Sequence, residues 1–153
     1  MPLGKLVFKD GVEGSYFDPE TGEIDLTAGK RPTKEMLRHE RSHAVYHVLP
    51  EATKQSLLDT FEREIGCETY MNSGRTIHPA SYYMYPEELG VGVCKGLVVN
   101  EFIAVLASHP SHLLDDVNGF NYAPQFRQIL IDNGFYTVNR TLRNLNLGGV
   151  SYV

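Results

Sequence analysis

Cysteine is scarce in this chain, with two residues among 153, against six histidines. So few thiols exclude a metal cage built from thiolates alone, whereas the imidazoles leave a metal site open. Because no secretory signal precedes Cys67 and Cys94, we expect two reduced thiols rather than a disulfide, in a cytoplasmic protein.

Positive charge and long apolar runs are also lacking. The 14 Lys and Arg residues are outnumbered by 19 Asp and Glu residues, so the formal charge is −5, and no basic run could bind nucleic-acid phosphates. No stretch reaches the roughly 18 consecutive apolar residues of a membrane span, so we expect no membrane partner. With 42% hydrophobic and 22% charged residues, the composition is typical of a globular protein, and the length predicts a single domain over residues 1–153.

Turn residues divide the first thirty residues into three short segments of strand character. Asp-Gly at residues 10–11 and an Asp-Pro-x-x-Gly run at residues 18–22 supply the turns. In the third segment Ile24 and Leu26 alternate with polar residues such as Asp25, which is typical of a strand with one buried and one wet face. We therefore predict a small antiparallel meander with strands over residues 3–9, 14–17 and 23–27.

The rest of the chain has mainly helical character. Thr33 can cap a helix that continues to Leu49, where Pro50 ends it. An amphipathic pattern closed by Gly66 predicts a second helix over residues 51–65. The fold class is therefore α+β, a small N-terminal antiparallel sheet followed by a mainly helical part. Residues 67–86 are expected to form a functional loop. Two further helices are expected over 87–108 and 124–132, the first of them weakened by glycines in its first half, and a short strand or irregular tail follows.

His39-Glu40-Arg41-Ser42-His43 is an H-E-x-x-H pattern within the first predicted helix. The spacing places His39 and His43 about 40° apart on one helix face and about 6 Å apart along the axis, so both imidazoles can bind one zinc ion. Glu40 lies at the neighbouring edge of that face, where its carboxylate can serve as general base toward a metal-bound water. Chance produces the pattern in only about two per cent of scrambled sequences of this composition.

A zinc site needs a third protein ligand. His47 continues the four-residue spacing, but it lies about 12 Å from His39 along the helix, too far for one metal ion. Three roles stay open for His47: lining the site, supporting the ligands, or serving as a partnered core histidine. Glu101 is the better ligand, because it is the only ionisable side chain in the apolar run 97–107, and a buried carboxylate needs a neutralising cation.

The sequence resembles the zincin metallopeptidases, and among them the gluzincin-like group. The H-E-x-x-H helix of that family is matched by residues 39–43, and its Asn-Glu-x-x-Ala setting on a later helix is matched by residues 100–104. The resemblance covers about residues 23–108. It implies a zincin-like fold, Zn2+ on His39, His43 and Glu101 with Glu40 as base, and an unpaired edge strand, 23–27 here, that aligns an extended peptide.

Two parts of the family pattern are not matched directly. Many gluzincins have an Asp four residues after the ligand Glu, where it orients a metal-bound His, and this chain has Val105 there. Asp115, Asp116 or a backbone carbonyl would have to orient that His instead. For the group that stabilises the oxyanion, the tyrosine-rich loop offers several side chains, of which we select Tyr83 and His78.

Three functions are compatible with these residues. The leading hypothesis is a zinc-dependent endopeptidase that acts on a protein or peptide substrate through a metal-activated water. The second is a catalytically silent, zincin-like binding or regulatory module, which Val105 and the small size suggest. The third is a metal hydrolase that acts on a non-peptide amide or ester.

Overall fold

The computed structural model describes residues 2–66, 91–108 and 123–148, and only the backbone of residues 91–95 and 97. Within these residues it has a three-stranded sheet and five helices, which confirms the α+β class. None of the described helices is long and apolar enough to cross a membrane.

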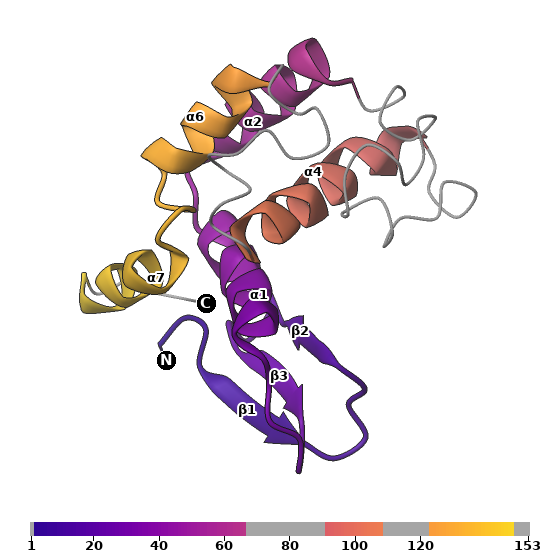
Figure 1. The fold of residues 1–153 in the computed structure, drawn as a ribbon, viewed down its shortest axis with the longest axis vertical. Coiled ribbons are helices and arrows are strands. Elements are labelled where there is room, and N and C mark those ends of the chain that lie inside the picture. Colours follow the sequence, from indigo (N-terminus) through magenta and orange to yellow (C-terminus); the bar gives the residue numbers. More distant parts are fainter. Residues whose placement is uncertain (1, 67–90, 109–122, 149–153) are drawn as a thin grey trace.

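Figure 1 shows α1 in the middle, between α4 and α7 and beside the sheet. The elements are β1 (Leu6–Lys9), β2 (Ser15–Phe17), β3 (Ile24–Thr27), α1 (Lys34–His47), α2 (Glu51–Glu64), α4 (Val91–Ser108), α6 (Pro124–Asp132) and α7 (Val138–Leu147).

The third strand, β3, occupies the centre of the sheet, whose order is β1-β3-β2. β1 pairs with β3 in parallel and β2 pairs with β3 antiparallel, so the sheet is mixed and the predicted antiparallel meander is wrong. The turn between β2 and β3 forms as expected, with Gly22 N–H donating to the Asp18 carbonyl at 2.8 Å. The connection from β1 to β2 instead crosses the end of β3, where the Thr27 hydroxyl donates to the Val12 carbonyl at 2.6 Å. A local turn signal at residues 10–11 therefore did not determine which strands pair.

Asp25 is fully buried on β3, although the alternation of that strand predicted a wet face at this position. Lys9 Nζ, on the neighbouring β1, lies 3.2 Å from Asp25 Oδ1. The Asp25 carboxylate raises the pKa of Lys9 and also that of Tyr16 on β2. A cation from an adjacent strand thus compensates a carboxylate that the central position of β3 removes from water.

Helices α1 and α2 begin and end close to the predicted positions because their end signals are local. Thr33 Oγ1 accepts a hydrogen bond from Met36 N–H at 3.1 Å and caps α1. Pro50 separates the two helices. Gly66 has a φ of 87°, and its N–H donates to the Phe61 carbonyl at 2.9 Å, which closes α2.

The core is formed where α1, α2, α4 and α6 meet. α4 is one continuous helix, so the glycines in its first half do not interrupt it. Three phenylalanines from α2, α4 and α6, namely Phe61, Phe102 and Phe126, pack with ring centroids 5.6–5.8 Å apart. Glu101 neighbours Phe102 on α4, so this packing holds the part of α4 that enters the site.

The C-terminal region differs from the expectation. α6 has the predicted bounds, but α7 is a helix where a strand or irregular tail was predicted. Val138 and Leu142 are buried and Leu145 packs against the core, which is the i, i+4, i+7 spacing of an amphipathic helix. The asparagines of this segment have low helix propensity and conceal that spacing. Asn146 bonds both backbone groups of Leu3, at 2.7 and 3.0 Å, and ties α7 to the start of the chain.

Candidate metal centre

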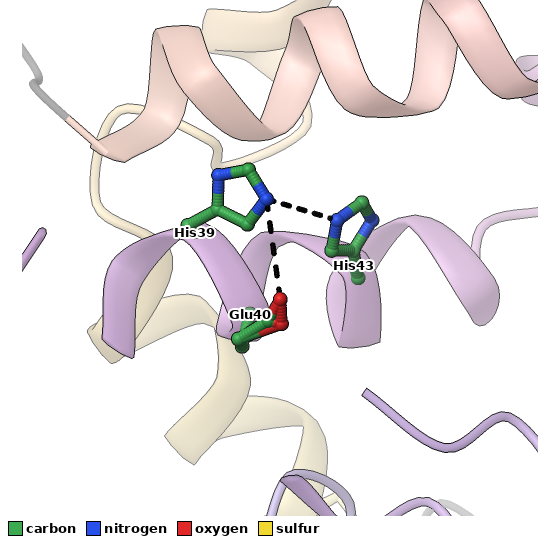
Figure 2. A group of neighbouring side chains, drawn as sticks. All are labelled: His39, Glu40 and His43. Atoms are coloured by element: carbon green, nitrogen blue, oxygen red, sulfur yellow. Dashed lines mark hydrogen bonds and ion pairs between the residues drawn. The ribbon is translucent and has the colours of Figure 1, made fainter. Parts of the chain in front are cut away.

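Two histidines on one face of α1 form the centre of the site. The Nε2 atoms of His39 and His43 are 3.3 Å apart, and their ring centroids are 5.0 Å apart. Figure 2 shows both imidazoles with Glu40, all carried by the same helix. One ligand atom from each of these three residues lies within 4.8 Å of the others, so the group is close enough to hold a metal ion.

Glu101 reaches the same two nitrogens from α4. Its Oε2 atom lies 3.2 Å from His39 Nε2, and its Oε1 atom lies 3.1 Å from His43 Nε2. Glu40 belongs to the compact group on α1, but its Oε1 atom is farther from His39 Nε2, at 3.9 Å. We therefore favour Glu101 over Glu40 as the carboxylate that shares a metal ion with both imidazoles, because it is close to both at once.

The spacing of these donors suits zinc. Ligand atoms that each lie 2.0–2.2 Å from one tetrahedral zinc ion are about 3.3–3.5 Å from each other. The two imidazole nitrogens are 3.3 Å apart, which matches this value, and each lies 3.1–3.2 Å from a different oxygen of the Glu101 carboxylate, which therefore faces both. Two imidazoles and one carboxylate are also a donor set that zinc accepts when it keeps a position open.

The charge of Glu101 also suits a cation. Burial by itself raises the pKa of the Glu101 carboxyl, but hydrogen bonds with His39 and His43 outweigh burial and hold that pKa well below its usual range. Burial is the largest single influence on the pKa of His43 and lowers it, but the hydrogen bond and charge of Glu101, together with Glu40 and Asn100, outweigh burial and raise that pKa. Glu101 is thus a carboxylate that remains ionised between two imidazoles.

Asn100 belongs to the candidate site, although the sequence analysis named it only as part of the Asn-Glu-x-x-Ala match and gave it no role. Its Oδ1 atom lies 2.8 Å from His43 Nδ1. An amide oxygen only accepts hydrogen bonds, so this contact places the proton of His43 on Nδ1 and leaves Nε2 free to bind a metal. The signal was present in the sequence, because Asn100 directly precedes Glu101, but only the packing of α4 on α1 shows which histidine it meets. Asp115 and Asp116 lie outside the described residues.

Glu40 has the surroundings expected of a base. The residue is 5% exposed, and its Oε2 atom makes no hydrogen bond within the described part of the chain. Burial raises the pKa of Glu40, and this effect exceeds the lowering by His43 and His39. An unsatisfied buried carboxylate oxygen is costly, so a proton-carrying group held in the site, such as a water, would stabilise it. This orphaned oxygen is a second reason why the residues present fit a metal site.

The other predicted residues lie apart from this group or outside the described residues. The His47 ring packs against the Phe17 ring, with centroids 5.7 Å apart, and its backbone carbonyl accepts from Lys54 Nζ at 3.0 Å. Burial and then Lys54 lower the pKa of His47. His47 is therefore a packed and partnered histidine beyond the turn that carries His39 and His43. His78 and Tyr83 lie outside the described residues.

The strand expected to align a peptide is not at an edge. β3 has β1 on one side and β2 on the other, so the expectation for residues 23–27 is wrong. Within the described residues β2 is the edge strand that packs against α1.

Comparisons with protein-family models, with curated proteins and with solved structures find no match for this chain. The functional argument therefore depends on the chemistry of the residues and their geometry.

Proposed function

We propose that the protein is a zinc-dependent endopeptidase with a zincin-like fold. The observation that carries this proposal is the convergence of Glu101, from α4, with His39 and His43, from α1. These donors are separated in sequence by nearly sixty residues, and no packing requirement explains why a carboxylate on an otherwise apolar helix should meet both imidazoles. A shared metal ion explains it.

The residues divide the chemistry among them. His39 Nε2, His43 Nε2 and the Glu101 carboxylate would hold the metal, and Asn100 keeps the Nε2 atom of His43 available by accepting from Nδ1. Bound zinc lowers the pKa of a coordinated water toward neutrality. Glu40 takes the proton from the attacking water at a carboxylate oxygen and returns it to the leaving amine. Burial raises the pKa of Glu40, which is the direction that a base that later returns the proton requires.

The edge of β2 is the best place in the described residues for an extended peptide. β2 pairs only with β3 there, and it packs against α1. The contact between Phe17 on β2 and His47 places this strand about 6 Å along α1 from His43, which is roughly one helical turn. A peptide added to this edge would be aligned by main-chain hydrogen bonds.

The proposal is tested with zinc content and proteolysis of the parent protein and of Glu40→Gln. We expect the parent to hold one zinc ion per chain and to cleave an unstructured protein, and Glu40→Gln to hold zinc while cleaving about 10²–10⁴-fold more slowly. Glu35→Gln is the matched control, because Glu35 is an exposed acid in the first turn of the same helix. Equal cleavage by the parent and Glu40→Gln would exclude Glu40 as the base.

The two competing functions give different results in the same experiment. A silent binding or regulatory module predicts a folded protein with weak or no zinc and no cleavage. Val105 supports this alternative, since the side chain in the place of the family's orienting Asp is buried and apolar. A hydrolase for non-peptide amides or esters would hold zinc and depend on Glu40, yet leave every peptide bond in a substrate library intact.

A further inference from the structure

Arg38, the residue before His39, connects three parts of the molecule. Its Nε–H donates to the Ala107 carbonyl, in the last turn of α4, at 2.9 Å. Its Nη2–H donates to the Tyr136 carbonyl, in the segment that leads into α7, at 3.1 Å. Figure 1 shows α4 and α7 on opposite sides of α1. One guanidinium on the helix that carries both histidines therefore contacts α4 and the entry to α7.

The contact with Ala107 satisfies a carbonyl that α4 cannot satisfy itself. The last four carbonyls of a helix have no partner within the helix. The Ser108 hydroxyl donates to the Val105 carbonyl at 2.7 Å, and Arg38 donates to Ala107. Positive charge is favourable at this end of a helix, and a hydrogen bond from a charged donor is stronger than one from a neutral donor. The contact therefore holds the C-terminal end of α4 against the start of α1.

Two polar contacts at different positions along the helix axes hold α4 on α1. Near the start of α1, Arg38 meets Ala107; farther along α1, His43 meets Asn100. Because the partners run in opposite order, the two helices are antiparallel. The contacts are about 7.5 Å apart along α1 and about 10.5 Å apart along α4. Together with the apolar packing of α4 in the core, the two contacts restrict its register and tilt on α1, and Glu101 lies between them.

We propose that Arg38 is a positioning residue for the metal centre, which sets the register of α4 on α1 and so brings Glu101 to His39 and His43. This inference rests on the proposed zinc site. Within residues 2–66, 91–108 and 123–148, the hydrogen bonds of Arg38 go to backbone carbonyls, so we infer that it acts on the metal through the placement of Glu101.

The test compares Arg38→Met, Arg38→Lys and a matched control, Arg41→Met. Arg41 is on the same helix, but it donates to Asn139 Oδ1 on α7 and makes no contact with α4 among the described hydrogen bonds. Zinc affinity is measured by competition with a chromophoric chelator, and the coordination is read from the absorption spectrum of the Co2+-loaded proteins. Thermal unfolding of the metal-free proteins is measured alongside, because a purely structural residue would change only that.

We expect Arg38→Met to bind zinc about tenfold more weakly than the parent and to change the Co2+ spectrum, as the loss of an outer positioning contact does. Arg38→Lys keeps a charged donor for Ala107 and recovers part of the affinity, and Arg41→Met matches the parent. Parental affinity and spectrum in Arg38→Met would overturn the positioning role, as would an equal loss in Arg41→Met. If Arg38→Met does not fold, zinc affinity and the Co2+ spectrum are compared between Arg38→Lys and Arg41→Met. Weaker binding by Arg38→Lys then supports the positioning role, and equal binding overturns it. A parent that binds no zinc would instead overturn the proposed function.

Discussion

Carboxylates are removed from water in two regions of this molecule, the sheet and the α1–α4 pair, and they are compensated in different ways. Asp25 on β3 has a cation of the chain itself, Lys9 Nζ, at 3.2 Å. Glu101 meets two imidazoles, and the buried Glu40 beside it keeps an oxygen without a hydrogen bond in the described residues. Both regions thus keep buried carboxylate oxygens without a hydrogen bond in the described residues, and they differ in the compensating group: an ammonium group in the sheet, and two imidazoles, which can bind a metal ion, at the helix pair.

This difference separates a structural group from a binding group. A carboxylate paired with a lysine of the neighbouring strand stabilises one arrangement of strands. Imidazoles are neutral ligands as well as hydrogen-bond donors, so a metal ion can replace the contacts that they make with Glu101. Changes in the sheet should therefore alter stability alone, and changes at the helix pair should alter metal binding most.

The largest expected effect is on zinc binding by Glu101→Gln. This variant keeps the shape of the side chain and removes its charge, so we expect zinc affinity to fall on the order of 1,000-fold, more than for loss of an outer contact. The stability of the metal-free protein should change little, since the Glu101 side chain is 35% exposed and solvent weakens its pairs. Chelator competition and denaturant unfolding measure the two quantities. Parental zinc affinity would show that Glu101 is no ligand.

The opposite result is expected for Lys9→Met in the sheet. Methionine keeps an apolar stem but leaves the Asp25 carboxylate buried without its cation, so the melting temperature should fall by about 5 °C. Zinc affinity should equal that of the parent. Combining Lys9→Met with Asp25→Leu removes both charges and should restore most of the lost stability. A change in zinc affinity in the single variant would show that the two regions are coupled.

A smaller effect is expected from Asn100→Ala, which keeps all three proposed ligands. Without the acceptor at 2.8 Å from Nδ1, the His43 ring loses its fixed orientation, so zinc affinity should fall about tenfold. Asn139→Ala is the matched control, because that amide also bonds an α1 side chain, Arg41, away from the site. Equal affinities in the two variants would mean that the Asn100 contact does not orient the ligand.

The parts of this molecule that depend on local spacing were predictable from sequence. The turn of α1 brings His39 and His43 together, and the Thr33 cap and Gly66 mark helix ends, because each involves residues only a few positions apart. Glu101 was selected for a different reason: a carboxylate among apolar residues has to meet a compensating group somewhere.

The parts that depend on pairing between distant segments were not predictable. β1 and β3 pair in parallel, and the cation that pairs with Asp25 lies on β1. The alternation of apolar and polar residues within one strand predicts neither of these pairings. Asn100 orients His43 only because α4 packs on α1 in one register. Each of these contacts requires the position of a second element, which no single segment of the sequence encodes.

The smallest predicted effect is a pH dependence confined to the sheet pair. The hydrogen bond to Asp25 raises the pKa of Lys9 above its ordinary value of 10.5. A raised pKa means that the Lys9 contribution is fully present below 10.5 and is lost as the pH rises through the higher pKa of the folded state. The difference in unfolding free energy between the parent and Lys9→Met should therefore narrow above pH 10.5 and stay constant between pH 6 and 9. Because the difference is taken between matched proteins, titrations that Lys9 does not influence cancel from it; the pKa of Tyr16 is lowered by Lys9, so the comparison is made with Tyr16→Phe in both proteins. A difference that persists unchanged at high pH would show that the charge of Lys9 does not account for its contribution, and the contrast between the sheet pair and the α1–α4 pair would then fail.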